Sequence, residues 1–282
     1  GKKFQYFKFQ TTINPFGIIF NPVSLEKLIR RCVENRQFTE NDIFLHNELW
    51  HCFEVHSELS NLDKNTFLNS LNELIDVTHQ QLNNATHIII TLGTSWVYRN
   101  IETNEIVANC HKVPQKQFTK ELLTISEIEE SLENIISLVH SVNPNCNFIF
   151  TVSPVRHIKD GFVENTLSKA HLIAALHTSS FQLPTSNYFP SYEIMVDELR
   201  DYRFYAEDML HPNQTAIDYI WIKFFENYIS ESEFRLMNAI CEIQRALKHR
   251  PFNPNTERHQ NFLSSLETKI IKIKEKLPTI QF

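Results

Sequence analysis

Two strand-length apolar runs are the clearest pattern in the chain. Residues 86–92 read Thr-His-Ile-Ile-Ile-Thr-Leu, and residues 147–152 read Asn-Phe-Ile-Phe-Thr-Val. A run that is apolar at nearly every position is typical of a strand buried on both faces, as in a parallel sheet. We therefore expect two parallel strands, the first ending at Gly93 and the second at Ser153.

Segments with helical spacing alternate with these runs. Apolar residues recur at intervals of three and four over residues 24–35, 66–83, 126–141, 162–177 and 212–228. Ser24 is expected to cap the first helix, and Pro212 suits the first position of the last helix, where a missing N–H costs nothing. Short strands are expected at 9–13 and 188–195, and residues 40–65 read as irregular. This alternation predicts a three-layer α/β/α domain with a mostly parallel sheet.

The last part of the chain has a different pattern. Residues 230–278 are charged and helical, and Arg-Pro-Phe-Asn-Pro at 250–254 interrupts them. We expect a C-terminal helical hairpin packed on the domain, and its apolar stripe could instead bind a partner or a second copy of the chain. The predicted division is a main domain at 1–229 and a helical appendage at 230–282.

Composition narrows the functional classes. The net charge is -6 and no basic run occurs, which disfavours nucleic acid as a partner. The apolar runs are too short for a membrane span. The five cysteines are widely spaced without a Cys-x-x-Cys pair, which predicts reduced thiols and a cytoplasmic protein. The spacing of His51, His56, Cys110 and His111 fits no zinc pattern, so we expect neither a metal nor another cofactor.

A carboxylate and an imidazole stand three residues apart before the last helix of the main domain. Asp208 and His211 in Asp-Met-Leu-His lie in a loop, where a single turn can bring the carboxylate to Nδ1 of the imidazole. Nε2 would then be available as a general base for a serine. The alternative is a helix-capping segment with a surface histidine, and the spacing alone favours that alternative.

Polar residues also follow both predicted strands. Gly93, Thr94 and Ser95 follow the first strand, and Arg156 and His157 lie shortly after the second. Ligands bind beyond the carboxyl ends of the strands in open parallel sheets. Gly93, Thr94 or Ser95 could donate hydrogen bonds to an oxyanion, and an arginine can hold a carboxylate or phosphate. The alternative for the three residues after the first strand is an ordinary turn, and the alternative for Arg156 is a structural ion pair.

Taken together, several stretches resemble the GSCFA family. They are FQTTINPFGIIFNP at 9–22, TLGTSWVYR at 91–99, ANCHKVP at 108–114, TVSPVRHIKD at 151–160, YFPSYEIMVDELRDYR at 188–203 and FYAEDMLHPN at 204–213. The resemblance covers about residues 1–228. It implies an SGNH-hydrolase-like, flavodoxin-like sheet and, by analogy, ester hydrolysis or acyl transfer on a small-molecule or carbohydrate ester.

The resemblance also implies roles for individual residues. Asp208 and His211 match the Asp and His of a catalytic triad, Gly17 matches a glycine of the oxyanion hole, and Gly93 matches the glycine of the Gly-x-Asn motif. Ser95 stands where that motif has Asn. The Gly-Ser-Cys-Phe-Ala stretch that contains the family's serine does not occur in the sequence, and neither does the strand expected with it.

Three functions remain open at this point. The first is a serine ester hydrolase seen without its nucleophile, for which we expect the chain alone to be inactive. The second is a non-catalytic ligand-binding protein on the same fold, and the third is an acyltransferase that uses the same triad. One fold supports all three, so the fold does not distinguish them.

Overall fold

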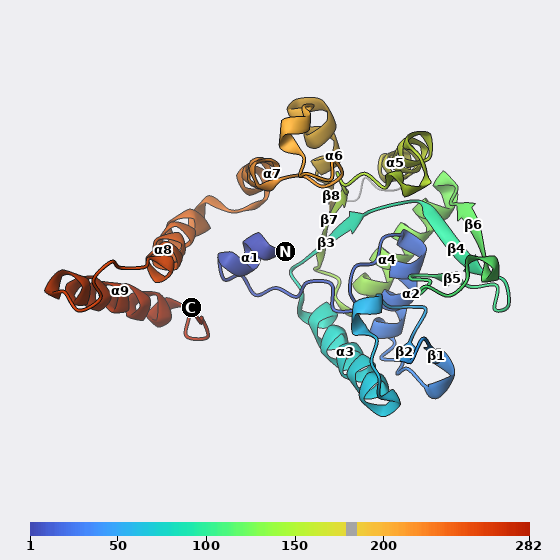
Figure 1. Ribbon diagram of the computed structural model, residues 1–282, viewed down its shortest axis with the longest axis horizontal. Coiled ribbons are helices and arrows are strands. Elements are labelled where there is room, and N and C mark those ends of the chain that lie inside the picture. Colours follow the sequence, from blue (N-terminus) through green and yellow to red (C-terminus); the bar gives the residue numbers. More distant parts are fainter. Residues whose placement is uncertain (179–184) are drawn as a thin grey trace. The chain divides into compact units, whose positions relative to one another are not determined.

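The computed structural model describes residues 1–178 and 185–282 and has a mixed α/β architecture (Figure 1). Its contacts divide the chain into two compact units. One unit consists of residues Gly1–Ile13 and Trp221–Phe282, and the other of residues Asn14–Ile220. All of the candidate site residues belong to the larger unit.

A parallel sheet forms the centre of the larger unit. Its strands are β3 (His87–Leu92), β7 (Asn147–Val152) and β8 (Ser186–Tyr188), in the order β3-β7-β8. The register pairs His87 with Asn147 and Leu92 with Val152, so β3 and β7 end at the same level. The two strands predicted from apolar runs are therefore confirmed, and their carboxyl ends lie side by side. Burial on both faces holds only for β7, because His87, Ile89 and Thr91 on one face of β3 are exposed.

Four long helices pack with this sheet around one hydrophobic core. They are α2 (Pro22–Val33), α3 (Lys64–Asn84), α4 (Ile125–Val142) and α5 (Phe162–Leu176), close to the predicted ranges. The predicted cap of α2 was wrong: Asn21, not Ser24, caps the helix, and its side chain accepts the Ser24 N–H at 2.8 Å. Proline at the first position makes this start favourable, since its missing N–H needs no partner.

The pattern did not reveal the antiparallel strands. β4 (Trp96–Asn100), β5 (Ile106–Val107) and β6 (Phe118–Leu122) form a second sheet in the order β5-β4-β6, and β1 (Phe44–His46) pairs with β2 (Leu49–His51). The expectation that 40–65 would be irregular was thus wrong at β1 and β2. Short 3-10 turns lie at Glu40–Asp42, Ser57–Leu59, Gln115–Gln117, Ile158–Asp160 and Tyr202–Phe204.

Three further expectations need correction. Residues 9–13 form no strand. The strand predicted at 188–195 is only β8, because Pro190 follows it and starts the short helix α6 (Ser191–Glu193), which continues as a π-helix over Ile194–Leu199. α7 (Gln214–Tyr228) begins after Pro212, and Asn213 Oδ1 accepts the Ala216 N–H at 3.1 Å as an N-cap does.

The smaller unit is helical. It contains α1 (Lys2–Tyr6), the second half of α7, α8 (Glu231–Lys248) and α9 (Glu257–Lys276). The ring of Phe4 packs edge-on against Trp221 and Phe224, at centroid distances of 5.3 and 5.7 Å.

The expected hairpin is present in α8 and α9, which share a small core made of Ile240, Ile243, Leu266, Ile273 and Ile280. Self-association through these helices stays a prediction. None of the helices in the described ranges is both long and apolar enough to cross a bilayer.

Candidate functional site

Asp208 and His211 form a directly bonded pair in the loop that leads into α7. Oδ2 of Asp208 lies 2.6 Å from Nδ1 of His211, and Oδ1 accepts the backbone N–H groups of Leu210 and His211 at 2.9 and 3.0 Å. The contact between the carboxylate and Nδ1 that the loop position of the pair allows is therefore present. The carboxylate thus fixes the ring and leaves Nε2 pointing away from it as the nitrogen that can accept a proton.

The backbone of the loop holds this pair in place. Met209, between the two residues, has a φ of 60°, which turns the chain sharply enough for one carboxylate to reach the next residues. The Ala206 N–H donates to the His211 carbonyl at 2.7 Å, and Tyr205 forms a β-bridge with Pro212. The loop is therefore a closed turn at the entry to α7.

The hydrogen bonds of the loop also set the charge of the pair. The His211 and Leu210 N–H groups, followed by the His211 ring, lower the pKa of Asp208 to about 2. The side chains of His211 and Asp208 are 60% and 45% exposed, so the pair is open to a ligand. Within residues 1–178 and 185–282, no hydroxyl or other side chain is bonded to Nε2 of His211.

Arg156 lies next to this loop, as expected for a residue just beyond the end of β7. The backbone N–H of Arg156 donates to the Leu210 carbonyl at 3.3 Å, which joins the segment after β7 to the loop before α7. The guanidinium stacks on the ring of Tyr205 at 4.2 Å and lies 5.2 Å from the ring of Tyr202. Nη1 reaches the Tyr202 hydroxyl at 3.4 Å, a long hydrogen bond.

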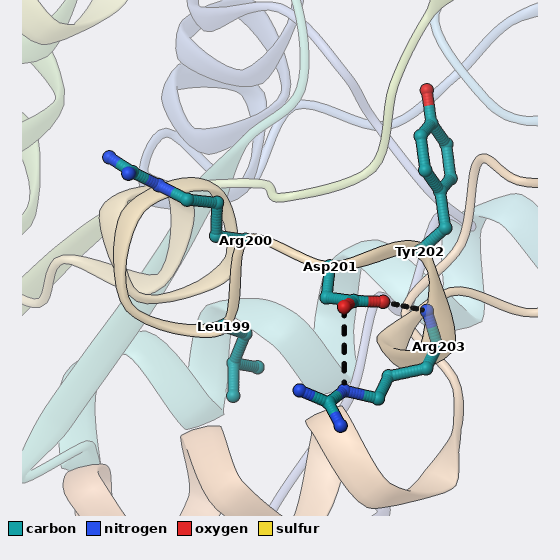
Figure 2. Close-up of a pocket in the computed structure, with 5 residues that line it drawn as sticks. All are labelled: Leu199, Arg200, Asp201, Tyr202 and Arg203. Atoms are coloured by element: carbon teal, nitrogen blue, oxygen red, sulfur yellow. Dashed lines mark hydrogen bonds and ion pairs between the residues drawn. The ribbon is translucent and has the colours of Figure 1, made fainter.

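Residues 199–203 line an open hollow of about 520 Å³. Figure 2 shows the side chains of these five residues. The carboxylate of Asp201 turns toward Arg203, accepting its backbone N–H at 2.8 Å, while Arg200 extends away from that pair (Figure 2). Neither Arg156 nor His211 lines this hollow, and the Tyr202 hydroxyl is its link to Arg156.

His157 packs inside the same edge. Burial, with the nearby positive charge of Lys169, lowers the pKa of His157 to about 4, so the ring is neutral near pH 7. Its ring lies edge-on to Phe20 with centroids 5.6 Å apart, and its backbone N–H donates to Asn165 Oδ1 at 2.8 Å. A neutral ring in this position can orient a ligand, but it is buried more deeply than His211.

The three residues after β3 already use their hydrogen-bond donors within the protein. The Gly93 and Thr94 N–H groups both donate to the Phe20 carbonyl, at 2.8 and 3.2 Å. Ser95 is fully buried, and its hydroxyl donates to the Ser168 carbonyl at 3.0 Å. The structure therefore does not offer these expected oxyanion donors to a ligand.

Gly17 also uses its N–H within the fold. The N–H donates to the Asn14 carbonyl at 2.8 Å, and a Cβ at this position would lie 2.2 Å from the His56 Cβ. With a φ of +77°, Gly17 makes a turn that other residues adopt only with strain. No contact of Gly17 with Gly93 or His211 is found in the described residues. The Phe20 carbonyl, three residues after Gly17, accepts the Gly93 N–H and so connects the two segments.

Lys169 is the residue that sequence reasoning missed. It lies on α5 and is only 1% exposed, yet no carboxylate of the described residues pairs with it. Nζ donates to the carbonyls of Gly93 at 2.6 Å and Ser153 at 2.8 Å, and so ties the ends of β3 and β7 together. Burial lowers the pKa of Lys169 to about 7. In the sequence it occupies one charged position of a helix, which gives no signal of burial.

The site contains no arrangement for a metal. Among the described residues, no group of three or more His, Cys, Asp or Glu side chains could hold a metal ion. The residues that do come together are Asp208, His211, Arg156 and His157, with Lys169 beneath them. A bonded carboxylate–imidazole pair can act as a general base, and a guanidinium can hold an anion.

Comparison with known proteins identifies one family. The model of the GSCFA family matches residues 1–224, and the model of the GSCFA domain protein, C-terminal domain, matches residues 240–282. No curated protein and no solved structure matches the chain.

Proposed function

Because the chain belongs to the GSCFA family, we propose that it carries the acid–base part of a serine-type ester hydrolase site. The observation that supports this proposal is the 2.6 Å bond between the Asp208 carboxylate and Nδ1 of His211. A bonded carboxylate–imidazole pair at the carboxyl edge of a parallel sheet has the geometry of a general base. The substrate is a small-molecule or carbohydrate ester.

In this proposal, Nε2 of His211 removes the proton from a serine hydroxyl as its oxygen attacks the ester carbonyl. Asp208 remains ionised and stabilises the imidazolium that forms. The imidazolium then gives the proton to the departing alcohol as the C–O bond breaks, which leaves an acyl-serine. Water, deprotonated by the same nitrogen, releases the acid and restores the serine.

The serine belongs, in this proposal, to the Gly-Ser-Cys-Phe-Ala stretch that names the family, outside the printed sequence. One feature of the sheet supports this assignment. β3 pairs with β7 along one edge, and no strand of the described residues pairs with its other edge. A strand added there would end beside Gly93, at the same edge as His211.

A ligand-binding protein without catalysis is the second candidate. It is favoured by the observation that Nε2 of His211 has no hydroxyl partner in the part of the chain that the structure describes. An acyltransferase would use the same pair but pass the acyl group to an alcohol instead of water. Product analysis with a competing alcohol or sugar distinguishes transfer from hydrolysis.

A paired ester assay tests the proposal. The printed chain and the product of the whole reading frame that encodes it should be assayed side by side with 4-nitrophenyl acetate. We expect turnover only in the whole product, and we expect His211→Ala to reduce it by about 10²–10⁴-fold. Gln214→Ala, an exposed change three residues away, is the control and should leave turnover unchanged.

Two results would contradict the hydrolase proposal. Turnover that survives His211→Ala would remove this residue from the chemistry. Turnover by the printed chain that is lost in Ser153→Ala would place the nucleophile at the end of β7. If neither protein turns over any ester but both bind one, the binding-protein candidate is favoured instead.

We place the protein in the cytoplasm as part of the same proposal. All five cysteines are free, and three of them, Cys32, Cys52 and Cys146, are buried. Free thiols are the state that a reducing compartment maintains.

A further inference from the structure

We propose that the ligand of this site carries a carboxylate group, which the guanidinium of Arg156 binds while the ester reaches His211. This inference rests on the proposed function, because it names the class of ester that the same site would accept. It begins from the arginines on this face of the larger unit.

Three arginines of the described residues lie on this face, and only one of them has no acidic partner. Arg200 pairs with Asp197 at 3.7 Å, and Arg203 pairs with Asp201 at 3.6 Å. Arg156 forms no ion pair with any carboxylate of the described residues. It is also partly buried, whereas the other two side chains are each 75% exposed. Its charge is therefore the one that remains available to an anion.

The aromatic contacts of Arg156 leave its binding edge available. The Tyr205 ring lies against the guanidinium at 4.2 Å and holds it without using its N–H groups. A guanidinium has five N–H groups arranged as a fork in its own plane, which matches the two oxygens of a carboxylate. The one side-chain hydrogen bond of Arg156 to a described residue, to the Tyr202 hydroxyl, is long at 3.4 Å and can yield to a charged acceptor.

The position of Arg156 gives the ligand its orientation. Its backbone N–H binds the carbonyl of Leu210, the residue immediately before His211. Arg156 and His211 therefore belong to adjoining segments, and in our proposal the ligand extends from the guanidinium toward the imidazole.

The charge around the site favours a single negative charge on the ligand. Lys169 is buried and both of its close contacts are carbonyls, so it adds positive potential but does not reach the ligand. Arg156 is thus the one direct partner, with a charge of +1. A monoanionic carboxylate matches this charge better than a phosphate dianion does, although the fork of the guanidinium suits both groups.

Binding to the printed chain tests the inference without requiring turnover. The probes are monomethyl succinate, which has an ester and a carboxylate, dimethyl succinate, which has the same skeleton without charge, and inorganic phosphate. We expect monomethyl succinate to shift the amide NMR signals of Arg156 and His211 in a saturable titration, and to bind about tenfold or more tightly than dimethyl succinate.

Two variants of Arg156 and one control locate the interaction. Arg156→Gln should weaken monomethyl succinate about tenfold or more. Arg156→Lys keeps the charge but not the fork, so it should give an intermediate affinity. Arg36→Gln removes an exposed arginine of the same unit that lies outside the site, and it should leave the affinity unchanged. Thermal unfolding of all three variants should match the parent, which excludes a general loss of structure.

Each remaining outcome overturns the inference. These outcomes are equal binding of the two succinate esters, binding of phosphate in place of the carboxylate, no binding of any probe, or unchanged binding in Arg156→Gln. The ester assay separates this result from the proposed function. Turnover that depends on His211 but prefers neutral esters would retain the function and reject the carboxylate. Binding of the carboxylate without turnover of any ester would retain the inference about the ligand and reject the hydrolase function.

Discussion

Asp208 is bonded to His211 twice: Oδ2 meets the ring at Nδ1 at 2.6 Å, and Oδ1 accepts the backbone N–H at 3.0 Å. The second bond fixes the carboxylate relative to the chain, so the first can fix the ring. A ring that donates from Nδ1 must carry its free lone pair on Nε2 when it is neutral. The structure therefore predicts the tautomer of neutral His211, and this prediction can be tested without an activity assay.

We predict that neutral His211 is mainly the Nδ1–H tautomer and that Asp208→Asn abolishes this preference. An amide cannot stabilise Nδ1–H as a carboxylate does, and it can present its own N–H to the ring. Long-range ¹H–¹⁵N NMR spectra of the side chain distinguish the two ring nitrogens directly. Asp201→Asn is the matched control, because Asp201 also accepts a backbone N–H two residues on but does not contact His211.

The same change should lower ester turnover in the whole reading-frame product. If the pair acts as proposed, Asp208→Asn costs about 10²–10⁴-fold in rate, while Asp201→Asn has little effect. Since the hydrogen bonds from the loop lower the pKa of Asp208 to about 2, the carboxylate stays ionised throughout an assay between pH 5 and about 9. A new ionisation near pH 4–5 assigned to Asp208 would contradict this picture.

Two neighbouring arginines on α2 provide a prediction about stability. Arg31 is 3% exposed, and it binds Glu54 through Nε at 2.9 Å and Nη2 at 2.7 Å, with Asp42 at 3.1 Å. Arg31→Met leaves a buried carboxylate with a weaker partner, Lys27 at 3.5 Å, so we expect a loss of about 3–5 kcal/mol in the free energy of unfolding.

Arg30→Met is the control for this prediction. Arg30, whose side chain is 42% exposed, forms one pair with Glu26 within the same helix, at 2.8 Å. Its loss should change the unfolding free energy by about 0.5 kcal/mol or less. Urea denaturation of both variants measures the difference, and equal effects would show that the Arg31 network does not stabilise the fold.

Gly17 provides a prediction about backbone geometry. Gly17→Ala places a Cβ 2.2 Å from the His56 Cβ at a φ of +77°, so we expect a loss of about 2 kcal/mol or more in stability. The clash and the strain can be separated with His56→Gly, which removes the Cβ that the new methyl group meets. In that background, Gly17→Ala should cost about 1 kcal/mol, the contribution of the strained φ alone. If the losses of stability from Gly17→Ala and His56→Gly simply add in the double variant, the contact between these two residues makes no contribution.

The sequence was sufficient for features that depend on continuous or local patterns. Strands β3 and β7 each have four apolar residues in six, and the Asp208–His211 bond spans three residues, so both can be predicted from local sequence. The antiparallel strands β4 and β6 were missed because WVYRN and FTKEL mix polar and apolar residues without a long apolar run.

The remaining site features depend on contacts between distant segments. The Phe20 carbonyl accepts both N–H groups of Gly93 and Thr94, and Ser168 surrounds the hydroxyl of Ser95. Nothing near residue 93 indicates these partners, which lie more than 70 positions away along the chain. The sequence therefore placed the expected oxyanion donors correctly at the end of β3. It could not show that these donors are hydrogen-bonded within the protein.

Lys169 leads to a prediction in which pH controls stability. Burial lowers the pKa of this lysine to about 7 in the folded protein, against about 10.4 in the unfolded chain. Between these values, the unfolded state holds a proton that the folded state has released. Stability must therefore rise with pH across that window, and below about pH 7 both states are protonated and the dependence disappears.

We expect the free energy of unfolding of the parent, relative to Lys169→Met, to increase by about 2 kcal/mol between pH 7 and pH 9. This figure is an upper limit, because the Gly93 and Ser153 carbonyls favour the charged ammonium group. Urea denaturation at both pH values measures the change, and Lys159→Met, an exposed lysine nearby, is the control. A parent whose stability tracks Lys169→Met at both pH values would show that Lys169 keeps an ordinary affinity for its proton.

A second readout connects Lys169 to the site. The positive charge of Lys169 contributes to lowering the pKa of His157, after burial itself. Lys169→Met should therefore raise the pKa of His157, while Lys159→Met should not. An NMR titration of the imidazole measures this shift independently of folding stability. If the pKa of His157 rises but the stability difference does not depend on pH, Lys169 is charged in the folded protein at neutral pH and acts as a fixed cation beneath Arg156 and His211.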